Sequence, residues 1–121
     1  MEYLGQPWEE DRDCYYWFRR IQEEVFARLV PPLAGTTRTI TAARYLRDIP
    51  KVWGWTQTET PREGDAVFLA QRIEPHHIGT VVRIGNKQQI LHAVRCSGVV
   101  LSDQALLRHN GWRIYGYWTK H

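Results

Sequence analysis

The N-terminal third of the sequence carries apolar residues at the spacing of one helical face. From residue 14 onward they recur at steps of three and four: Cys14, Phe18, Ile21, Val25 and Leu29. This is the period of an amphipathic helix. Asp13 stands directly before the run and belongs to the residue types that cap a helix N-terminus. Because the pair Pro31-Pro32 cannot continue a helix, the pattern predicts a helix that begins at Cys14 and ends before residue 31.

The pattern changes to that of strands after Pro61. Short runs rich in β-branched and aromatic residues alternate with turn residues: AVFLA (66–70), HIGTVVRI (77–84), QQILHAV (88–94), GVVLS (98–102) and WRIYGYW (112–118). Such runs predict an antiparallel sheet. A shorter helical pattern at 41–48 stops near Pro50. Helices followed by a sheet predict an α+β fold, and the chain length predicts one domain spanning residues 1–121.

Two histidines fall on one face of the predicted sheet. If Gly85-Asn86 form a two-residue hairpin turn, Ile84 faces Lys87 and Gly79 faces His92. His77 then lies diagonally from His92, at roughly 7–8 Å by strand geometry. Side-chain-free Gly79 leaves space beside the two rings, so we expect them to be neighbours.

Composition and charge narrow the class of protein. The chain is 43% hydrophobic and 24% charged, which is the balance of a globular protein. Its formal net charge is only +3 and its basic residues are scattered, so we expect no nucleic-acid partner. The start, MEYLGQPWEE, lacks the pattern of a signal peptide, and the sequence has no apolar run long enough for a bilayer. We therefore expect synthesis in the cytoplasm and no membrane partner.

The cysteines and histidines permit three kinds of chemistry. Two cysteines, Cys14 and Cys96, are too few for a disulfide framework, although one bridge between them stays open. A metal site would use both cysteines with His76, His77 and His92, but the sequence has no close ligand pair of the kind zinc sites show. We expect two free thiols, no metal and no cofactor.

A cysteine nucleophile with an imidazole base is the third chemistry. A helix start offers free N–H groups and positive potential, which lower the pKa of a thiol and can hold an oxyanion. Cys14 would be the nucleophile, His77 its base and His92 the group that orients the base. The alternative for Cys14 is a core cysteine, and for His77 a solvated residue in a turn or at a strand start. For His92 it is a core histidine with its hydrogen bonds satisfied.

Taken together, the segments resemble the NlpC-type cell-wall peptidases, cysteine enzymes that have a papain-like fold with a permuted chain order. The resemblance runs nearly end to end and is carried by YLGQPW (3–8), DC (13–14), PREGDAVFL (61–69), HIGTVV (77–82) and ILHA (90–93). It departs where relatives follow the cysteine with Ser-Gly and this chain has Tyr15-Tyr16. Within this family, the chain is most similar to single-domain members without additional domains, which are associated with phage tails or injected as effectors.

The resemblance implies a fold, a site and a substrate. The fold would be a papain-like core in which N-terminal helices, with the nucleophile at a helix start, pack on a C-terminal antiparallel sheet. Cys14, His77 and His92 would be catalytic, while Tyr3 and Asp13 would belong to the substrate and oxyanion environment. The implied reaction is hydrolysis of peptidoglycan stem peptides at a γ-D-glutamyl bond to a diamino acid.

Partners and rival functions also follow from the resemblance. Besides the peptidoglycan peptide, phage tail or secretion proteins are the implied partners, with the protein carried on a virion or delivered to the cell wall. Two other functions stay open. One is a non-catalytic tail-assembly or adaptor module, and the other is acyl transfer on the same scaffold.

Overall fold

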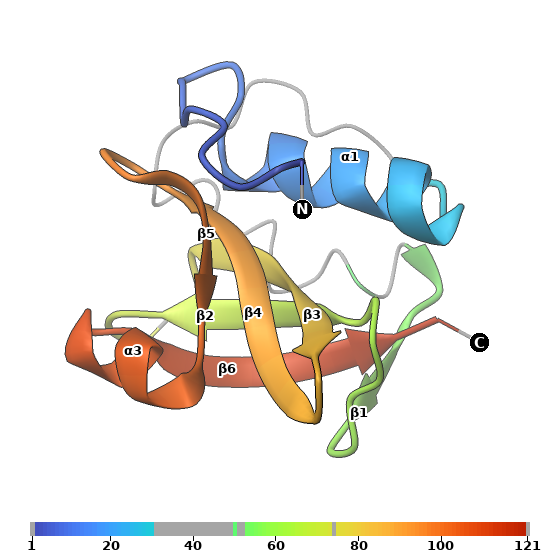
Figure 1. The fold of residues 1–121 in the computed structure, drawn as a ribbon. Helices are drawn as coiled ribbons and strands as arrows, with labels where there is room; N and C mark the ends of the chain where they lie inside the picture. The colour runs from blue at the N-terminus through green and yellow to red at the C-terminus, as the bar shows by residue number, and fades with distance from the viewer. Residues whose placement is uncertain (1, 31–49, 51–52, 74, 121) are drawn as a thin grey trace.

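Six strands form one antiparallel sheet in the computed structural model, which describes residues 2–30, 50, 53–73 and 75–120. Their order across the sheet is β1-β6-β2-β3-β4-β5. The strands are β1 (Thr56–Thr58), β2 (Ala66–Ala70), β3 (His77–Ile84), β4 (Lys87–Val94), β5 (Gly98–Ser102) and β6 (Arg113–Thr119). Helix α1 (Cys14–Phe26) lies across one side of the curved sheet, and the short helix α3 (Gln104–His109) lies on the other side (Figure 1).

The predicted α+β fold with a papain-like core and N-terminal helices is wrong. The described residues form a small mainly-β domain, in which α1 is the one long helix. The sheet is larger than predicted because β1, which had no strand signal, pairs with β6. The second predicted helix, at 41–48, lies outside the described residues.

The strand predictions after residue 61 are confirmed to within one residue. The hairpin between β3 and β4 has Ile84 opposite Lys87, as a two-residue turn requires. Gly85 adopts a φ of 65° whereas Asn86 does not have positive φ, which is the pattern of a type II′ turn. The turn residues thus fix the register that places His77 and His92 on one face.

Helix α1 begins as predicted and ends earlier. The Asp13 carboxylate caps it by accepting a hydrogen bond of 3.0 Å from the Tyr16 N–H. The helix stops at Phe26, because Ala27 turns into the left-handed region with a φ of 54°. As a result, Val25 is 54% exposed and Leu29 is 82% exposed, so neither belongs to the buried face that the spacing predicted.

The core is divided by the sheet into two faces. On the α1 face, Phe18 stacks on Trp53 at 5.7 Å and packs with Ile78 of β3. Further along α1, Ile21 packs on Leu91 of β4. Helix α3 packs on the opposite face of the sheet through Leu107. The buried residues on this face form what we call the far-face cluster: Val67, Leu69, Val81, Ile90 and Leu107.

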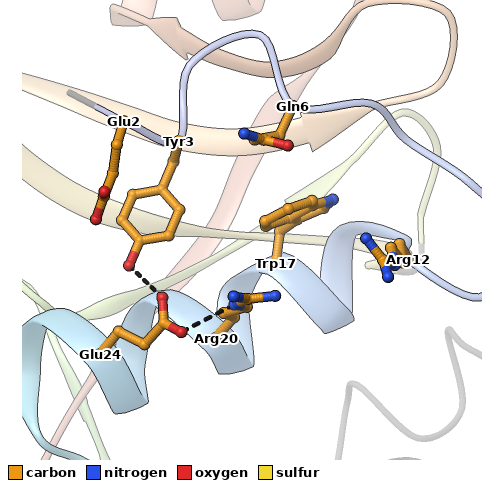
Figure 2. A pocket seen from close by; sticks show the side chains of 7 residues that line it. All are labelled: Glu2, Tyr3, Gln6, Arg12, Trp17, Arg20 and Glu24. Carbon is orange, nitrogen blue, oxygen red and sulfur yellow. Dashed lines mark hydrogen bonds and ion pairs between the residues drawn. The ribbon is translucent and has the colours of Figure 1, made fainter.

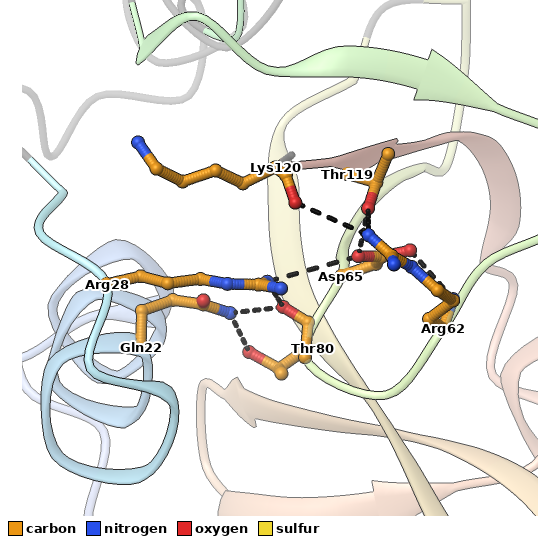
Figure 3. A network of polar contacts seen from close by, with 8 residues as sticks. Gln22, Arg28, Arg62, Asp65, Thr80, Thr119 and Lys120 are labelled. Carbon is orange, nitrogen blue, oxygen red and sulfur yellow. Dashed lines mark hydrogen bonds and ion pairs between the residues drawn. The ribbon is translucent and has the colours of Figure 1, made fainter.

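A polar network joins the end of α1 to the sheet (Figure 3). Gln22 and Arg28 each donate a 2.8 Å hydrogen bond to the Gly64 carbonyl. Asp65, whose side chain is fully buried, accepts a 2.7 Å hydrogen bond from Thr119 and lies 3.9 Å from Arg28. Because a buried carboxylate is costly without partners, these contacts explain why a polar face of α1 can be buried here.

The segment before α1 pairs with the last strand in the sheet order. The Gly5 N–H donates to the Val99 carbonyl at 2.9 Å, and the Val99 N–H donates to the Gln6 carbonyl at 2.8 Å. Residues 5 and 6 thereby lie along β5, and Gly98 closely faces the Gln6 carbonyl.

Candidate functional site

A chain of hydrogen bonds links three buried side chains on neighbouring strands. His77 is the first residue of β3, His92 lies on β4 and Ser102 ends β5. His77 Nε2 is 2.8 Å from His92 Nδ1, and His92 Nε2 is 2.8 Å from Ser102 Oγ. The three residues are 5%, 3% and 2% exposed. The predicted proximity of His77 and His92 is therefore confirmed.

Both imidazoles lie on the far face of the sheet, away from α1. His77 is paired with Leu69, and His92 follows Ile90 by two positions on β4. Because side chains alternate along a strand, the rings share the face of these two members of the far-face cluster. Trp112 stacks on the His77 ring at 4.6 Å and covers it.

The surroundings keep both histidines neutral. Burial lowers the pKa of His77 well below its usual value, and the neighbouring His92 and His76 act in the same direction. Burial also lowers the pKa of His92 to about 4. Each ring near neutral pH therefore has one N–H donor and one acceptor nitrogen.

Cys14 lies at the first position of α1, on the other face of the sheet. It is half-buried and packs against the cluster that contains Phe18 and Ile78. Among the described residues, no hydrogen bond joins its thiol to His77 or His92. The backbone N–H of Ile78, the residue after His77, is near enough to act on the thiol. The structure thus brings Cys14 to the start of β3 without pairing it with the imidazole.

The thiol is not activated in this arrangement. Burial raises the pKa of Cys14 to about 12, and the Asp13 carboxylate raises it further, whereas the backbone N–H of Ile78 lowers it. The backbone N–H groups of Cys14 and Tyr15 at the helix start lower this pKa, as predicted, but the loss of solvation outweighs them, so the net shift is upward. Cys14 is therefore a thiol at neutral pH and needs a base to react.

Tyr3 and Asp13 occupy structural positions. The Tyr3 hydroxyl donates a 2.6 Å hydrogen bond to Glu24 on α1, and burial raises the pKa of Tyr3 to about 12. Asp13 caps α1, and its partial burial raises its pKa. Tyr3 also lines a pocket between the N-terminal segment and α1. The charge of Asp13 acts on the neighbouring Cys14, whose pKa it raises.

A pocket of about 390 Å³ lies between the N-terminal segment and α1 (Figure 2). It is lined by polar and charged side chains around one indole: Glu2, Tyr3, Gln6, Arg12, Trp17, Arg20 and Glu24. Figure 2 shows Glu24 between Tyr3 and Arg20. Its carboxylate accepts a 2.6 Å hydrogen bond from the Tyr3 hydroxyl and a 2.9 Å hydrogen bond from Arg20 Nε. Arg12 lies at the opposite end, near the start of α1. The pocket offers charges of both signs to a polar ligand.

The other candidate chemistries have less support in the structure. Both cysteines are free, and Cys96 is exposed, with a φ of 75° in the turn between β4 and β5. His76 contacts Trp112 at 5.1 Å rather than a possible metal ligand. Within the described residues, no group of three His, Cys, Asp or Glu side chains is placed to hold a metal ion.

No family model matches the chain, and no curated protein matches it. In the described part of the chain, no helix is both long enough and apolar enough to cross a membrane.

Sequence reasoning missed Ser102. A single serine at the end of a short apolar run has no motif around it. The available signal was alternation: Ser102 is the register partner of Ile90, so it shares the face on which His92 lies. The strand order, which places β5 beside β4, was needed to use that signal.

Proposed function

We propose that this protein is a cysteine-dependent amide hydrolase that uses Cys14 as nucleophile and His77 as base. The observation that carries the proposal is the buried His77–His92 hydrogen bond. It occupies Nε2 of His77 and leaves Nδ1 of that ring for another partner. Cys14 lies against Ile78, the residue that follows His77, which places a thiol beside the start of β3.

In the proposed reaction, His77 Nδ1 takes the Cys14 proton as the sulfur attacks the amide carbonyl carbon. Free N–H groups at the start of α1 stabilise the oxyanion, and the protonated His77 gives its proton to the leaving amine. Water then attacks the thioester carbonyl carbon while His77 takes a proton from it. The C–S bond breaks, the acid leaves, and His77 returns its proton to the Cys14 sulfur. Because thiol and imidazole are both neutral at rest, proton transfer and attack must occur together. Because Cys14 and His77 lie on opposite faces of the sheet, the reaction also requires a movement of the start of α1 or of β3 that brings the sulfur and Nδ1 together around the end of the strand.

The pocket supports a charged peptide as the substrate. Arg12, which lies two residues before Cys14, offers a cation for a carboxylate, and Glu2 offers an anion for an ammonium group. Stem peptides of peptidoglycan, which carry a D-glutamyl residue and a diamino acid, have both groups. The NlpC-like motifs support the same substrate, so we propose cleavage of the γ-D-glutamyl bond.

Two observations favour a second candidate, a non-catalytic module of an assembly such as a phage tail. The Cys14 thiol has a raised pKa, and it makes no hydrogen bond to His77 among the described residues. In such a module, the hydrogen bond between the two histidines would stabilise the pairing of β3 with β4. Cys14 would be a packing residue on the α1 face.

Digestion of purified peptidoglycan, followed by mass spectrometry, separates these functions. We expect wild type and Cys96→Ala to release the same peptide fragments, because Cys96 is exposed and has no role in the proposed reaction. Cys14→Ala should release none. Products joined to an added amine would indicate acyl transfer. If Cys14→Ala is as active as wild type, or if wild type releases nothing, the proposed hydrolase is wrong.

A further inference from the structure

The hydrogen-bond chain of His77, His92 and Ser102 can run in two directions. Each neutral ring has a single N–H, so fixing the hydrogen on one ring fixes it on the next. The serine hydroxyl can either accept from His92 or donate to it. Distances of 2.8 Å at both links suit either direction.

The direction decides whether His77 has a basic nitrogen at Nδ1. In the first arrangement, His92 Nε2–H donates to Ser102 Oγ, and His77 Nε2–H donates to His92 Nδ1. His77 Nδ1 is then a free lone pair. In the second arrangement, Ser102 donates to His92, and His92 Nδ1–H donates to His77 Nε2. The hydrogen of His77 is then on Nδ1, which cannot take a proton.

Two physical arguments favour the first arrangement. The second would leave the Nδ1–H of His77 with no acceptor among the described residues, so that only solvent could accept from it. The first leaves only the hydroxyl hydrogen of Ser102, which can rotate toward whatever acceptor surrounds it. Neutral histidine in water also prefers the tautomer with its hydrogen on Nε2, and the first arrangement uses that tautomer for both rings.

We infer that Ser102 is a positioning residue that accepts the Nε2–H of His92 and thereby holds His77 with a free Nδ1. Its effect on catalysis rests on the proposed function, whereas its effect on the two tautomers does not. Ser102 acts on His77 through His92, with which it shares a 2.8 Å hydrogen bond.

Nitrogen-15 NMR of the histidine rings tests this directly. Protonated and bare ring nitrogens have well-separated shifts, and spectra of His77→Gln and His92→Gln assign the two rings. In wild type we expect both rings to carry hydrogen on Nε2. Ser102→Ala should populate the form with hydrogen on His77 Nδ1, and it should lower kcat by about tenfold, since one hydrogen bond is lost. Ser102→Thr, which keeps the hydroxyl, should retain the wild-type tautomers.

The outcomes separate the two proposals. Hydrogen on His77 Nδ1 in wild type overturns the inference, even if Ser102→Ala does not fold. Tautomers that are the same in folded Ser102→Ala and in wild type overturn it as well. If the tautomers are as inferred but wild type releases no peptide, the inference stands and the hydrolase proposal fails.

Discussion

Acidification should destabilise the fold through the buried histidines, and His92 gives the magnitude. Its pKa is lowered by burial from 6.5 to about 4. The unfolded chain therefore binds a proton below about pH 6.5 that the folded protein rejects. Stability contributed by the neutral His92 is complete above pH 6.5 and is lost as the pH falls toward 4. At pH 5 the linkage relation gives a loss of about 2 kcal/mol from this residue.

Other groups add to this loss or oppose it. The raised pKa of the Asp13 carboxyl opposes it, because that group binds a proton more readily in the folded protein. The lowered pKa of His77 also destabilises the folded protein as the pH falls. The pKa of the Asp103 carboxyl is lowered, chiefly by its hydrogen bond from Lys87, so its contribution is lost only at lower pH. Comparison of wild type with a variant that lacks the His92 titration removes such shared contributions.

Urea unfolding followed by tryptophan fluorescence measures the effect, since Trp17, Trp53 and Trp55 are buried. We expect the free energy of unfolding of wild type to fall by at least about 2 kcal/mol between pH 8 and pH 5. In His92→Gln the fall should be smaller by about 2 kcal/mol, whereas His109→Gln, on exposed α3, should behave as wild type. An identical pH dependence in wild type and His92→Gln would refute the reasoning.

Three further predictions concern packing, backbone and reactivity. Phe18→Ala, which removes a fully buried ring from the α1 face, should lower the free energy of unfolding by about 3–5 kcal/mol in the same urea assay, and a loss below 1 kcal/mol would contradict it. Gly98→Ala should lower Tm more than Gly111→Ala, because both have positive φ but only a side chain at 98 meets neighbouring backbone. Iodoacetamide at about pH 7.5 should label exposed Cys96 before half-buried Cys14, as peptide mass mapping would show; the reverse order would mean an activated Cys14.

Strand positions and the hairpin register were predictable because their signals are local. β-branched runs and the turn at Gly85-Asn86 are enough to place His77 beside His92. The sheet's extent was not predictable, since β1 is three exposed or half-exposed residues, Thr56–Thr58, whose pairing depends on β6. The predicted fold class was wrong because the described residues are mainly strand, with α1 as the one long helix among them.

The orientation of α1 was only partly predictable. Four consecutive aromatic residues, Tyr15–Phe18, fit more than one helical face. The structure buries Gln22 rather than Val25, because its amide reaches the Gly64 carbonyl in the sheet. That contact depends on a residue 42 positions away, which spacing along the helix cannot indicate. The raised pKa of the Cys14 thiol has the same origin, because burial against the sheet is a tertiary effect.

The pairing of residues 5 and 6 with β5 bears on self-association. A strand at the edge of a sheet presents unpaired N–H and C=O groups to which a strand of another molecule can add. At this edge, the Val99 N–H and C=O are both already used by the N-terminal segment. At the other edge, β1 offers only three residues. A chain shortened past residue 6 would present an apolar edge, GVVLS, to its copies, so this short pairing protects the protein against edge-to-edge aggregation.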